Sequence, residues 1–177
     1  MSCHRFASFL AVLSILGSAV IASAQPPIDQ LAIFETFVDT AWTGRFQDVR
    51  APQVDHVIEW SAILDGQAVR WSKRVDALGF SMETTFYWDR ELAAVAFVQL
   101  GNNGVHGHGT AWLEDNLLVV VGVSRQASGS VAFRQTFEIL ADGSLEDRYY
   151  RKSQEVWAPQ HVIVYHRSSE SAGNESS

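Results

Sequence analysis

The chain has 177 residues, of which 47% are hydrophobic and 19% are charged, and its formal net charge is -7. These proportions fit one globular domain, and the acidic balance argues against a nucleic-acid or anionic-membrane partner, because such partners attract basic surfaces. The single cysteine, Cys3, lies in a segment that we expect to be removed, so neither a disulfide nor a thiolate site is predicted.

Residues 1–24 have the features of a cleavable signal peptide. Arg5 gives a positive start, residues 6–22 are a nearly continuous apolar run, and Ala22-Ser23-Ala24 places small residues at a cleavage site. We therefore expect a mature chain that begins near Gln25, has no membrane span and is secreted or periplasmic.

The rest of the chain divides into one domain and a short tail. Residues 168–177 contain a single apolar residue, which predicts a disordered tail. Residues 25–167 are long enough to bury a sizeable core, and we expect them to form a single domain.

Residues 28–40 have apolar side chains at helical spacing. Ile28, Leu31 and Phe34 fall on one face, and Asp29 lies in the first turn, where the helix dipole favours an acid. The pattern predicts one short amphipathic helix.

From Trp42 onward the pattern is that of β-strands. Short runs rich in β-branched and aromatic residues end in turn sequences, of which Asp65-Gly66 and 101–104 are the clearest. The predicted strands are 42–52, 56–64, 67–75, 80–88, 92–100, 105–114, 117–124, 131–140, 144–152 and 156–166. About ten strands with short connections predict an all-β antiparallel meander, and closure into a barrel would remove its two edges. The helix would then cap one mouth of the barrel.

The segment Thr40-Ala41-Trp42-Thr43-Gly44-Arg45-Phe46 carries a resemblance to a known group. A short helix that leads into Trp42-Thr43-Gly44, followed by about ten meandering strands, resembles the calycins: lipocalins, fatty-acid-binding proteins, nitrobindin-type haem barrels and uncharacterised bacterial lipocalin-like domains. Trp42 and Gly44 match the Gly-x-Trp-type motif of the group. The glycine before Trp42 is missing, and Phe46 stands where nitrobindin-like proteins have a further glycine. The resemblance implies that Trp42 packs across the closed end of a barrel.

Arg148-Tyr149-Tyr150 carries a second resemblance. Fatty-acid-binding proteins hold a ligand carboxylate with an Arg-x-Tyr pair late in the chain, and Arg148 and Tyr150 match that spacing on one face of the penultimate strand. The resemblance implies a small apolar or amphipathic ligand.

The aromatic and charged residues within the strands leave two interpretations open. The tryptophans can line an apolar ligand cavity or fill an ordinary core, and Trp60 and Trp71 flank the Asp65-Gly66 turn, where they can face each other. The charged side chains can form a solvent-exposed outer face. If some of them point inward, an arginine guanidinium can instead bind a carboxylate or phosphate with two hydrogen bonds. The charged strand residues concerned are Glu59, Arg70, Arg74, Glu83, Arg134, Glu138, Arg148 and Arg151. The candidate ligand-binding residues are Trp60, Trp71, Arg134, Arg148 and Tyr150.

Two histidines share one face of a predicted strand. His106 and His108 alternate with Gly107 and Gly109, which lie on the opposite face and permit a close approach to the backbone. Joined by His56 or His161, the pair would supply three imidazoles for a zinc ion. The alternative is that the two histidines and Thr110 form a solvated outer face.

His161 has a second interpretation. The nitrobindin resemblance places it, on the last predicted strand, at the position of the axial haem ligand. No cofactor is predicted as the primary expectation, and zinc or haem at His106, His108 or His161 is the alternative.

The chain lacks the short motifs of common catalytic sites. Neither a Gly-x-Ser-x-Gly elbow, a phosphate-binding glycine loop nor a His-Glu-x-x-His motif is present. The sequence therefore predicts a secreted or periplasmic barrel that binds a small apolar or amphipathic ligand without catalysis. Two alternatives remain: a haem- or metal-dependent sensor or enzyme, and an envelope module whose sheet surface docks another protein.

Overall fold

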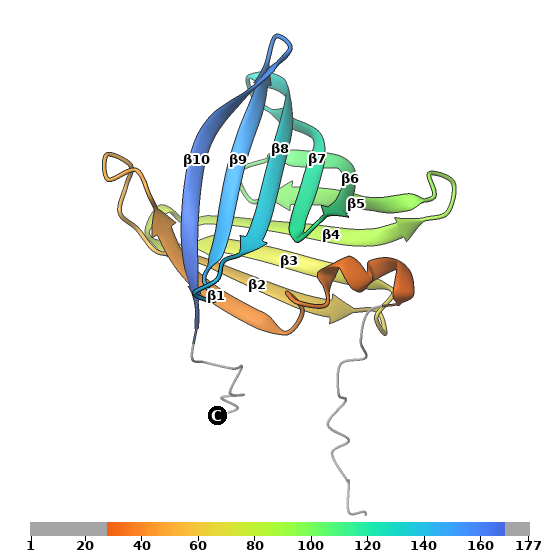
Figure 1. Cartoon of the computed structure of the whole chain (residues 1–177). Coiled ribbons are helices and arrows are strands. Elements are labelled where there is room, and N and C mark those ends of the chain that lie inside the picture. The colour runs from red at the N-terminus through yellow and green to blue at the C-terminus, as the bar shows by residue number, and fades with distance from the viewer. Residues whose placement is uncertain (1–27, 169–177) are drawn as a thin grey trace, which may run out of the picture.

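The computed structural model describes residues 28–168, which form a closed all-β barrel (Figure 1). The predicted signal peptide and all but the first residue of the predicted tail lie outside the described residues. In chain order the elements are η1 (Asp29–Phe34), β1 (Thr40–Phe46), β2 (His56–Ile63), β3 (Ala68–Val75), η2 (Asp76–Leu78), β4 (Phe80–Asp89), β5 (Ala94–Gly101), β6 (His106–Glu114), β7 (Leu117–Gln126), β8 (Gly129–Ile139), β9 (Leu145–Ser153) and β10 (Val156–Arg167).

The barrel is an antiparallel meander. Each strand pairs with the next along the chain, and β1 pairs with β10 to close the sheet. All ten predicted strands are confirmed, as is closure, which leaves no unpaired edge. In Figure 1 the wall formed by β7 to β10 rises steeply across the flatter wall of β2 to β4.

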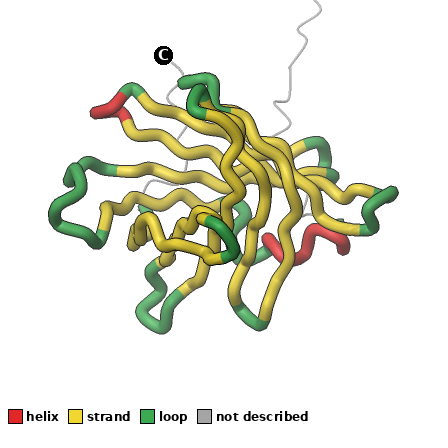
Figure 2. The backbone as a smooth tube through the Cα atoms, turned by 90° about the horizontal axis from the view of Figure 1, so that it is seen from above, coloured by secondary structure: helices red, strands yellow, loops and turns green. Residues whose placement is uncertain are grey.

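The connections lie at the two ends of the strands, and η1 and η2 appear on opposite sides of the view from above (Figure 2). The η1 end of the barrel holds the turn between β2 and β3, because the Ile28 amide donates to the Gly66 carbonyl oxygen at 3.0 Å. Neither helical segment within residues 28–168 is long and apolar enough to cross a membrane.

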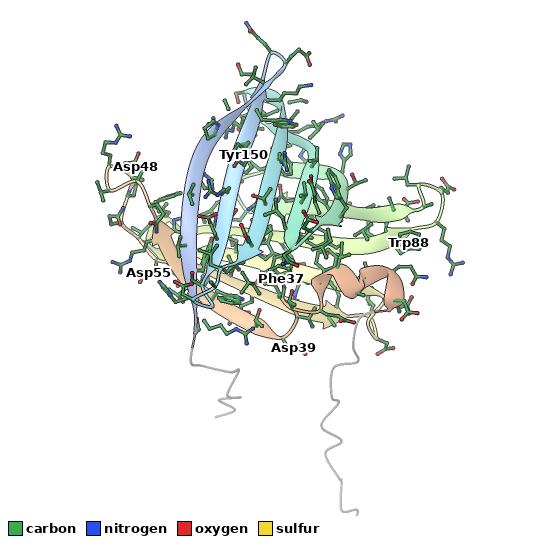
Figure 3. The ribbon with its side chains drawn as sticks, in the orientation of Figure 1. Phe37, Asp39, Asp48, Asp55, Trp88 and Tyr150 are labelled. Carbon is green, nitrogen blue, oxygen red and sulfur yellow. The ribbon has the colours of Figure 1, made fainter. Side chains whose placement is uncertain are left out.

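The N-terminal cap is shorter than predicted and is a 3-10 helix. Instead of a helix over 28–40, six residues form η1, and β1 already begins at Thr40. The spacing of the buried residues fits this: Leu31 and Phe34 are three apart, so three residues per turn places both on one side, and the buried Phe37 follows in the turn after η1. Figure 3 shows Phe37 next to η1. The two turns of η1 and the turn that follows therefore bury three large side chains.

The half of the barrel next to η1 is filled by aromatic rings. The Phe34 ring lies 4.7 Å from the Phe86 ring, and the Phe37 ring lies 5.2 Å from that of Trp60, measured between centroids. Each of these four side chains is at most 2% exposed. This end of the interior is therefore a close-packed apolar core.

Trp42 is fully buried and tied to the cap. Its indole N–H donates to Thr40 Oγ1 at 2.7 Å, and the Thr40 hydroxyl donates to the Phe37 carbonyl oxygen. The Arg167 guanidinium lies 5.0 Å from the Trp42 ring centroid, a cation–π contact between the first and last strands. This placement agrees with the position at the closed end that the calycin resemblance implies.

Candidate ligand-binding site

The inner wall away from η1 carries polar side chains. They occupy inward-facing positions of their strands, as on β3, where Val69, Trp71, Lys73 and Val75 alternate with outward residues and are all buried. We call the group the interior polar cluster, and its members are His56, Lys73, Gln135, Asp147, Tyr149, Arg151, His161 and Tyr165.

Aromatic stacking fixes the positions of both histidines of the cluster. The Phe46 ring makes edge-on contacts with His56 at 4.6 Å and with His161 at 5.2 Å between centroids. On its other side His161 stacks on Tyr149 at 5.2 Å with an interplanar angle of 15°. The Arg151 guanidinium lies 5.9 Å from the Tyr149 ring centroid.

Several buried polar atoms of the cluster have no hydrogen-bond partner within the described chain. They are both ring nitrogens of His56, Asp147 Oδ2, Arg151 Nε and the Tyr165 hydroxyl. Asp147 Oδ1, in contrast, accepts a hydrogen bond of 2.8 Å from Gln135 Nε2. A buried polar atom without a partner costs about 1–3 kcal/mol. Unpaired donors and acceptors gathered on one inner wall are therefore suited to a bound polar group.

Lys73 and Asp147 are two buried ionisable residues of the cluster. Lys73 is 8% exposed and Asp147 is fully buried, yet none of the ion pairs found among the described residues joins them. Burial lowers the pKa of the Lys73 ammonium, and the Asp147 charge opposes that change. Burial likewise raises the pKa of Asp147, against the effects of the Lys73 charge and the Gln135 hydrogen bond.

Both interior histidines are neutral at pH 7. Burial, followed by the Lys73 charge, lowers the pKa of His56 to about 4, although the charge of Asp55 raises it. Burial, Lys73, His56 and Arg151 together lower the pKa of His161 to about 3. A neutral imidazole has one nitrogen that can accept a hydrogen bond and one that can donate.

Two predicted ligand-binding residues, Trp60 and Trp71, lie in the apolar half. They are direct partners in the pairing of β2 with β3, and each is 1% exposed. Trp71 precedes Lys73 by two residues on the same inner face of β3, so it lies between the apolar core and the cluster.

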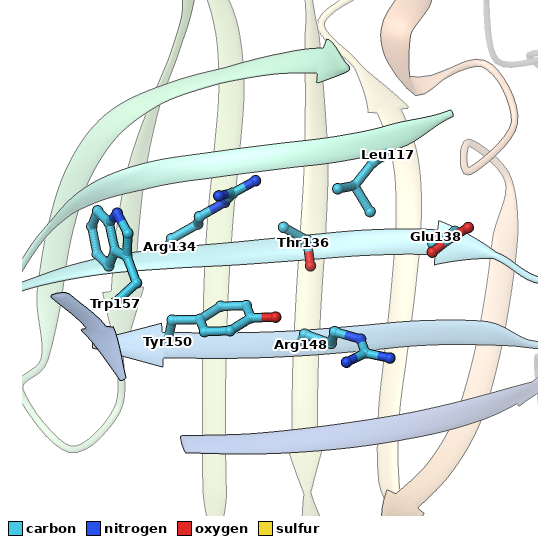
Figure 4. Close-up of a pocket in the computed structure, with 7 residues that line it drawn as sticks. All are labelled: Leu117, Arg134, Thr136, Glu138, Arg148, Tyr150 and Trp157. Carbon is cyan, nitrogen blue, oxygen red and sulfur yellow. The ribbon is translucent and has the colours of Figure 1, made fainter. Parts of the chain in front are cut away.

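The other three, Arg134, Arg148 and Tyr150, come together on the outer face of the barrel. On β9 the inward positions are Leu145, Asp147, Tyr149 and Arg151, so Arg148 and Tyr150 point outward. They line a groove of about 350 Å³ (Figure 4). Its lining residues are Leu117, Arg134, Thr136, Glu138, Arg148, Tyr150 and Trp157.

Carboxylates already pair with both arginines of the outer groove. Arg148 Nε donates to Glu146 Oε1 at 2.5 Å, and Arg134 lies 3.7 Å from Glu114. The inward-pointing arginine of β9 is instead Arg151, three residues after Arg148.

His106 and His108 lie exposed on the outer face of β6, paired with Leu100 and Val98 of β5. His161 is on the inner wall, so the structure does not bring the three predicted metal ligands together. Across residues 28–168, no group of three or more His, Cys, Asp or Glu side chains is placed to hold a metal ion.

The close approach predicted at the β6 glycines is present. A Cβ on Gly109 would lie 2.1 Å from the Val121 carbonyl oxygen and 2.9 Å from the Phe97 ring. The neighbouring strand and an inner aromatic ring therefore occupy the space that the glycine leaves.

Most of the cluster was not predicted from the sequence. The sequence of β3 does contain a signal for one member. Lys73 is the polar residue in the alternating series Val69, Trp71, Lys73 and Val75, whose other members are apolar. The same holds for Asp147, which lies two residues after the buried Leu145 on β9.

The chain matches no protein-family model and no curated protein sequence. The fold and the cluster define its class on physical grounds: a closed ten-stranded antiparallel barrel with a packed aromatic half and a polar inner wall.

Proposed function

We propose that this chain is a secreted or periplasmic lipocalin-like barrel that binds a small amphipathic molecule inside its polar half and does not transform it. The polar group of the ligand would meet the interior polar cluster, and its apolar part would lie against Trp71 and the rings beside it. The observation that carries the proposal is the set of buried, unpaired polar atoms on the inner wall.

The energetics favour a ligand over a purely structural role. A cluster that served only stability would be expected to pair its own donors and acceptors, as Gln135 and Asp147 do. Here His56 offers two unpaired nitrogens, Asp147 one unpaired oxygen and Tyr165 one unpaired hydroxyl. A ligand that donates to Asp147 Oδ2 and accepts from the Tyr165 hydroxyl would supply hydrogen bonds that the described chain does not make to these atoms.

The test is binding by the full chain, expressed with its own N-terminal segment and purified from the cell envelope. Native mass spectrometry followed by solvent extraction would identify a co-purifying molecule. Titration with decanol, decanoate and decylamine, followed by tryptophan emission, would find a class of ligand. We expect saturable binding that Asp147→Leu weakens and Arg148→Leu, on the outer face of the same strand, leaves unchanged. Absence of saturable binding for every amphiphile, with no extracted ligand, would refute the proposal.

The envelope location has its own test. Edman sequencing of the purified protein should begin near Gln25, and a full-length chain in the cytoplasm would contradict the assignment.

A haem- or metal-binding barrel is the second candidate, favoured by the placement of His161. Its imidazole faces the interior, is held between Phe46 and Tyr149, and is neutral, which is the form that ligates a metal. Elemental analysis and an absorption spectrum after addition of hemin decide this question. A Soret band that His161→Ala removes and His166→Ala leaves intact would support it. No metal and no band would rule it out.

A further inference from the structure

His106 and His108 form a pair of exposed imidazoles on the outer face of β6. They are two residues apart on one strand, so both side chains leave the same face and their Cα atoms are about 6.8 Å apart. Two imidazoles at this spacing can reach one zinc ion, each with a bond of about 2.0–2.1 Å. The pair therefore supplies half of the tetrahedral ligand set that a structural zinc site needs.

The neighbouring strands do not complete this ligand set. Within residues 28–168, no group of three or more His, Cys, Asp or Glu side chains is placed to hold a metal ion. The direct partners of the two histidines in the strand pairing are Val98 and Leu100 on β5 and Val123 and Arg125 on β7. The remaining ligands of a four-coordinate site must therefore come from another molecule.

The same outer face exposes apolar side chains beside the histidines. β6 lies between β5 and β7 in the sheet (Figure 1). Val98 is 46% exposed, Leu100 is 66% exposed and Val123 is 36% exposed. Apolar side chains gathered on one exposed face are typical of an interaction surface. Contact with a second molecule would thus cover these side chains and supply metal ligands at the same time.

Charge favours a second copy of the chain as that molecule. The formal net charge is -7, so most surfaces of two copies repel each other. The outer positions of β5, β6 and β7 carry one acid, Glu114, which is the last residue of β6, whereas the histidines are at its start. Arg125, opposite His106, is basic and exposed. A two-fold axis places the same patch of each copy against the other, so it brings two histidine pairs together.

We propose that His106 and His108 of two copies bind one zinc ion and so join two barrels through the outer faces of β5, β6 and β7. The ion receives four imidazole nitrogens, and Val98, Leu100 and Val123 of each copy pack around it. These few apolar side chains cover less than the about 800 Å² per partner that a specific interface buries, so the dimer depends on zinc. The site is outside the barrel and is separate from the interior polar cluster.

The experiment compares the mass of the protein in EDTA and in zinc chloride by sedimentation velocity. The full chain is expressed with its own N-terminal segment and without a histidine tag. We expect a monomer in EDTA and a doubled mass in zinc, with about one zinc ion per two chains by elemental analysis. A wild-type dimer that persists in EDTA, or zinc bound by a monomer with no increase in mass, would overturn the proposal. Absence of zinc binding would also overturn it.

Histidine variants test the ligands. His106→Ala and His108→Ala should each stay monomeric in zinc. Their zinc affinity in isothermal titration should fall by about tenfold or more, since even a residue that only supports a ligand is worth that much. His166→Ala, which removes an exposed imidazole from the outer face of β10, should dimerise like the wild type. A dimer that His108→Ala leaves unchanged would contradict the assignment.

Leu100 variants test the packing around the ion. Leu100→Lys places a cation beside the zinc ion in both copies, so it should stay monomeric at the zinc concentration that dimerises the wild type. Leu100→Met keeps an apolar side chain of similar size and should dimerise. Circular dichroism confirms that each variant is folded. A dimer of Leu100→Lys at the wild-type zinc concentration would show that the two copies do not meet through this face.

Discussion

Trp60 of β2 and Trp71 of β3 are direct partners across the first hairpin, and their ring centroids lie 5.9 Å apart inside the barrel. The Phe137 ring packs edge-on against both, at 5.3 Å and 5.5 Å. These three rings join the wall of β2 and β3 to that of β8, so the two walls of the barrel meet through aromatic contacts.

Trp60→Ala should destabilise the barrel severely. The indole is 1% exposed and touches Phe34, Phe37 and Phe137, so its loss leaves a cavity between the cap and both walls. The expected decrease in the free energy of unfolding is about 3–5 kcal/mol, measured by urea denaturation followed by far-ultraviolet circular dichroism.

Trp112→Ala is the matched control for that measurement. Trp112 is 42% exposed on the outer face of β6, and its replacement should change stability by no more than about 0.5 kcal/mol. Similar losses for the two variants would contradict the assignment of Trp60 to the core.

The strand pattern could be predicted because it depends on local chemistry. β-Branched and aromatic runs that end in turn residues define each strand. The Asp65-Gly66 turn allows Trp60 and Trp71 to face each other, and the structure pairs them directly. The cap was less predictable, since helical spacing in 28–40 also fits a three-residue period. Burial of Phe37 against Trp60, a tertiary contact, decides between the two.

Gly109→Ala should destabilise the wall between β6 and β7. The added Cβ would lie 2.1 Å from the Val121 carbonyl oxygen and 2.5 Å from Gly122 Cα, and these backbone atoms can move only if the strand pair separates. A loss of about 1–3 kcal/mol is expected. Thr110→Ala, at the next position with its side chain outward, should stay within about 0.5 kcal/mol. Equal thermal midpoints for the two variants would be inconsistent with this packing.

The candidate site was harder to predict than the fold, because it depends on which alternate residues of each strand face the interior of the barrel. Shifting a strand by one residue exchanges its inner and outer faces. Arg148 and Tyr150 match a ligand-binding spacing, yet they face outward, whereas Arg151 of the same strand faces the interior. A single sequence does not contain the contacts that select one face, which here are the stacking of Tyr149 on His161 and the hydrogen bond from Gln135 to Asp147.

His106→Ala and His108→Ala should each leave the fold intact. Both side chains are exposed on the outer face of β6, so their loss removes little packing. The expected change in the free energy of unfolding is at most about 0.5 kcal/mol. Differential scanning calorimetry of the two variants checks this, and a large drop in either melting temperature would mean that the outer face of β6 is covered in the folded protein.

Acid should destabilise the barrel through its interior histidines. The pKa of His56 is lowered from 6.5 to about 4 and that of His161 to about 3, mainly by burial. As pH falls below 6.5 the unfolded chain binds protons that the folded barrel excludes, so stability decreases from that pH down to the folded pKa values. Asp147 has the opposite effect on stability. Burial raises its pKa, so as pH falls the folded state binds this proton at a higher pH than the unfolded chain does, which favours folding.

His56→Phe isolates the histidine contribution. Phenylalanine keeps an aromatic ring beside Phe46 and cannot titrate, so the variant should lose less stability than the wild type between pH 7 and pH 5, by on the order of 2 kcal/mol. Urea denaturation at a series of pH values measures the difference. His108→Phe, on the exposed face, should retain the wild-type slope. Parallel pH profiles for the wild type and His56→Phe would contradict this prediction. They would mean that His56 binds a proton as readily in the folded barrel as in the unfolded chain, although it is buried beside Phe46 and near the Lys73 charge.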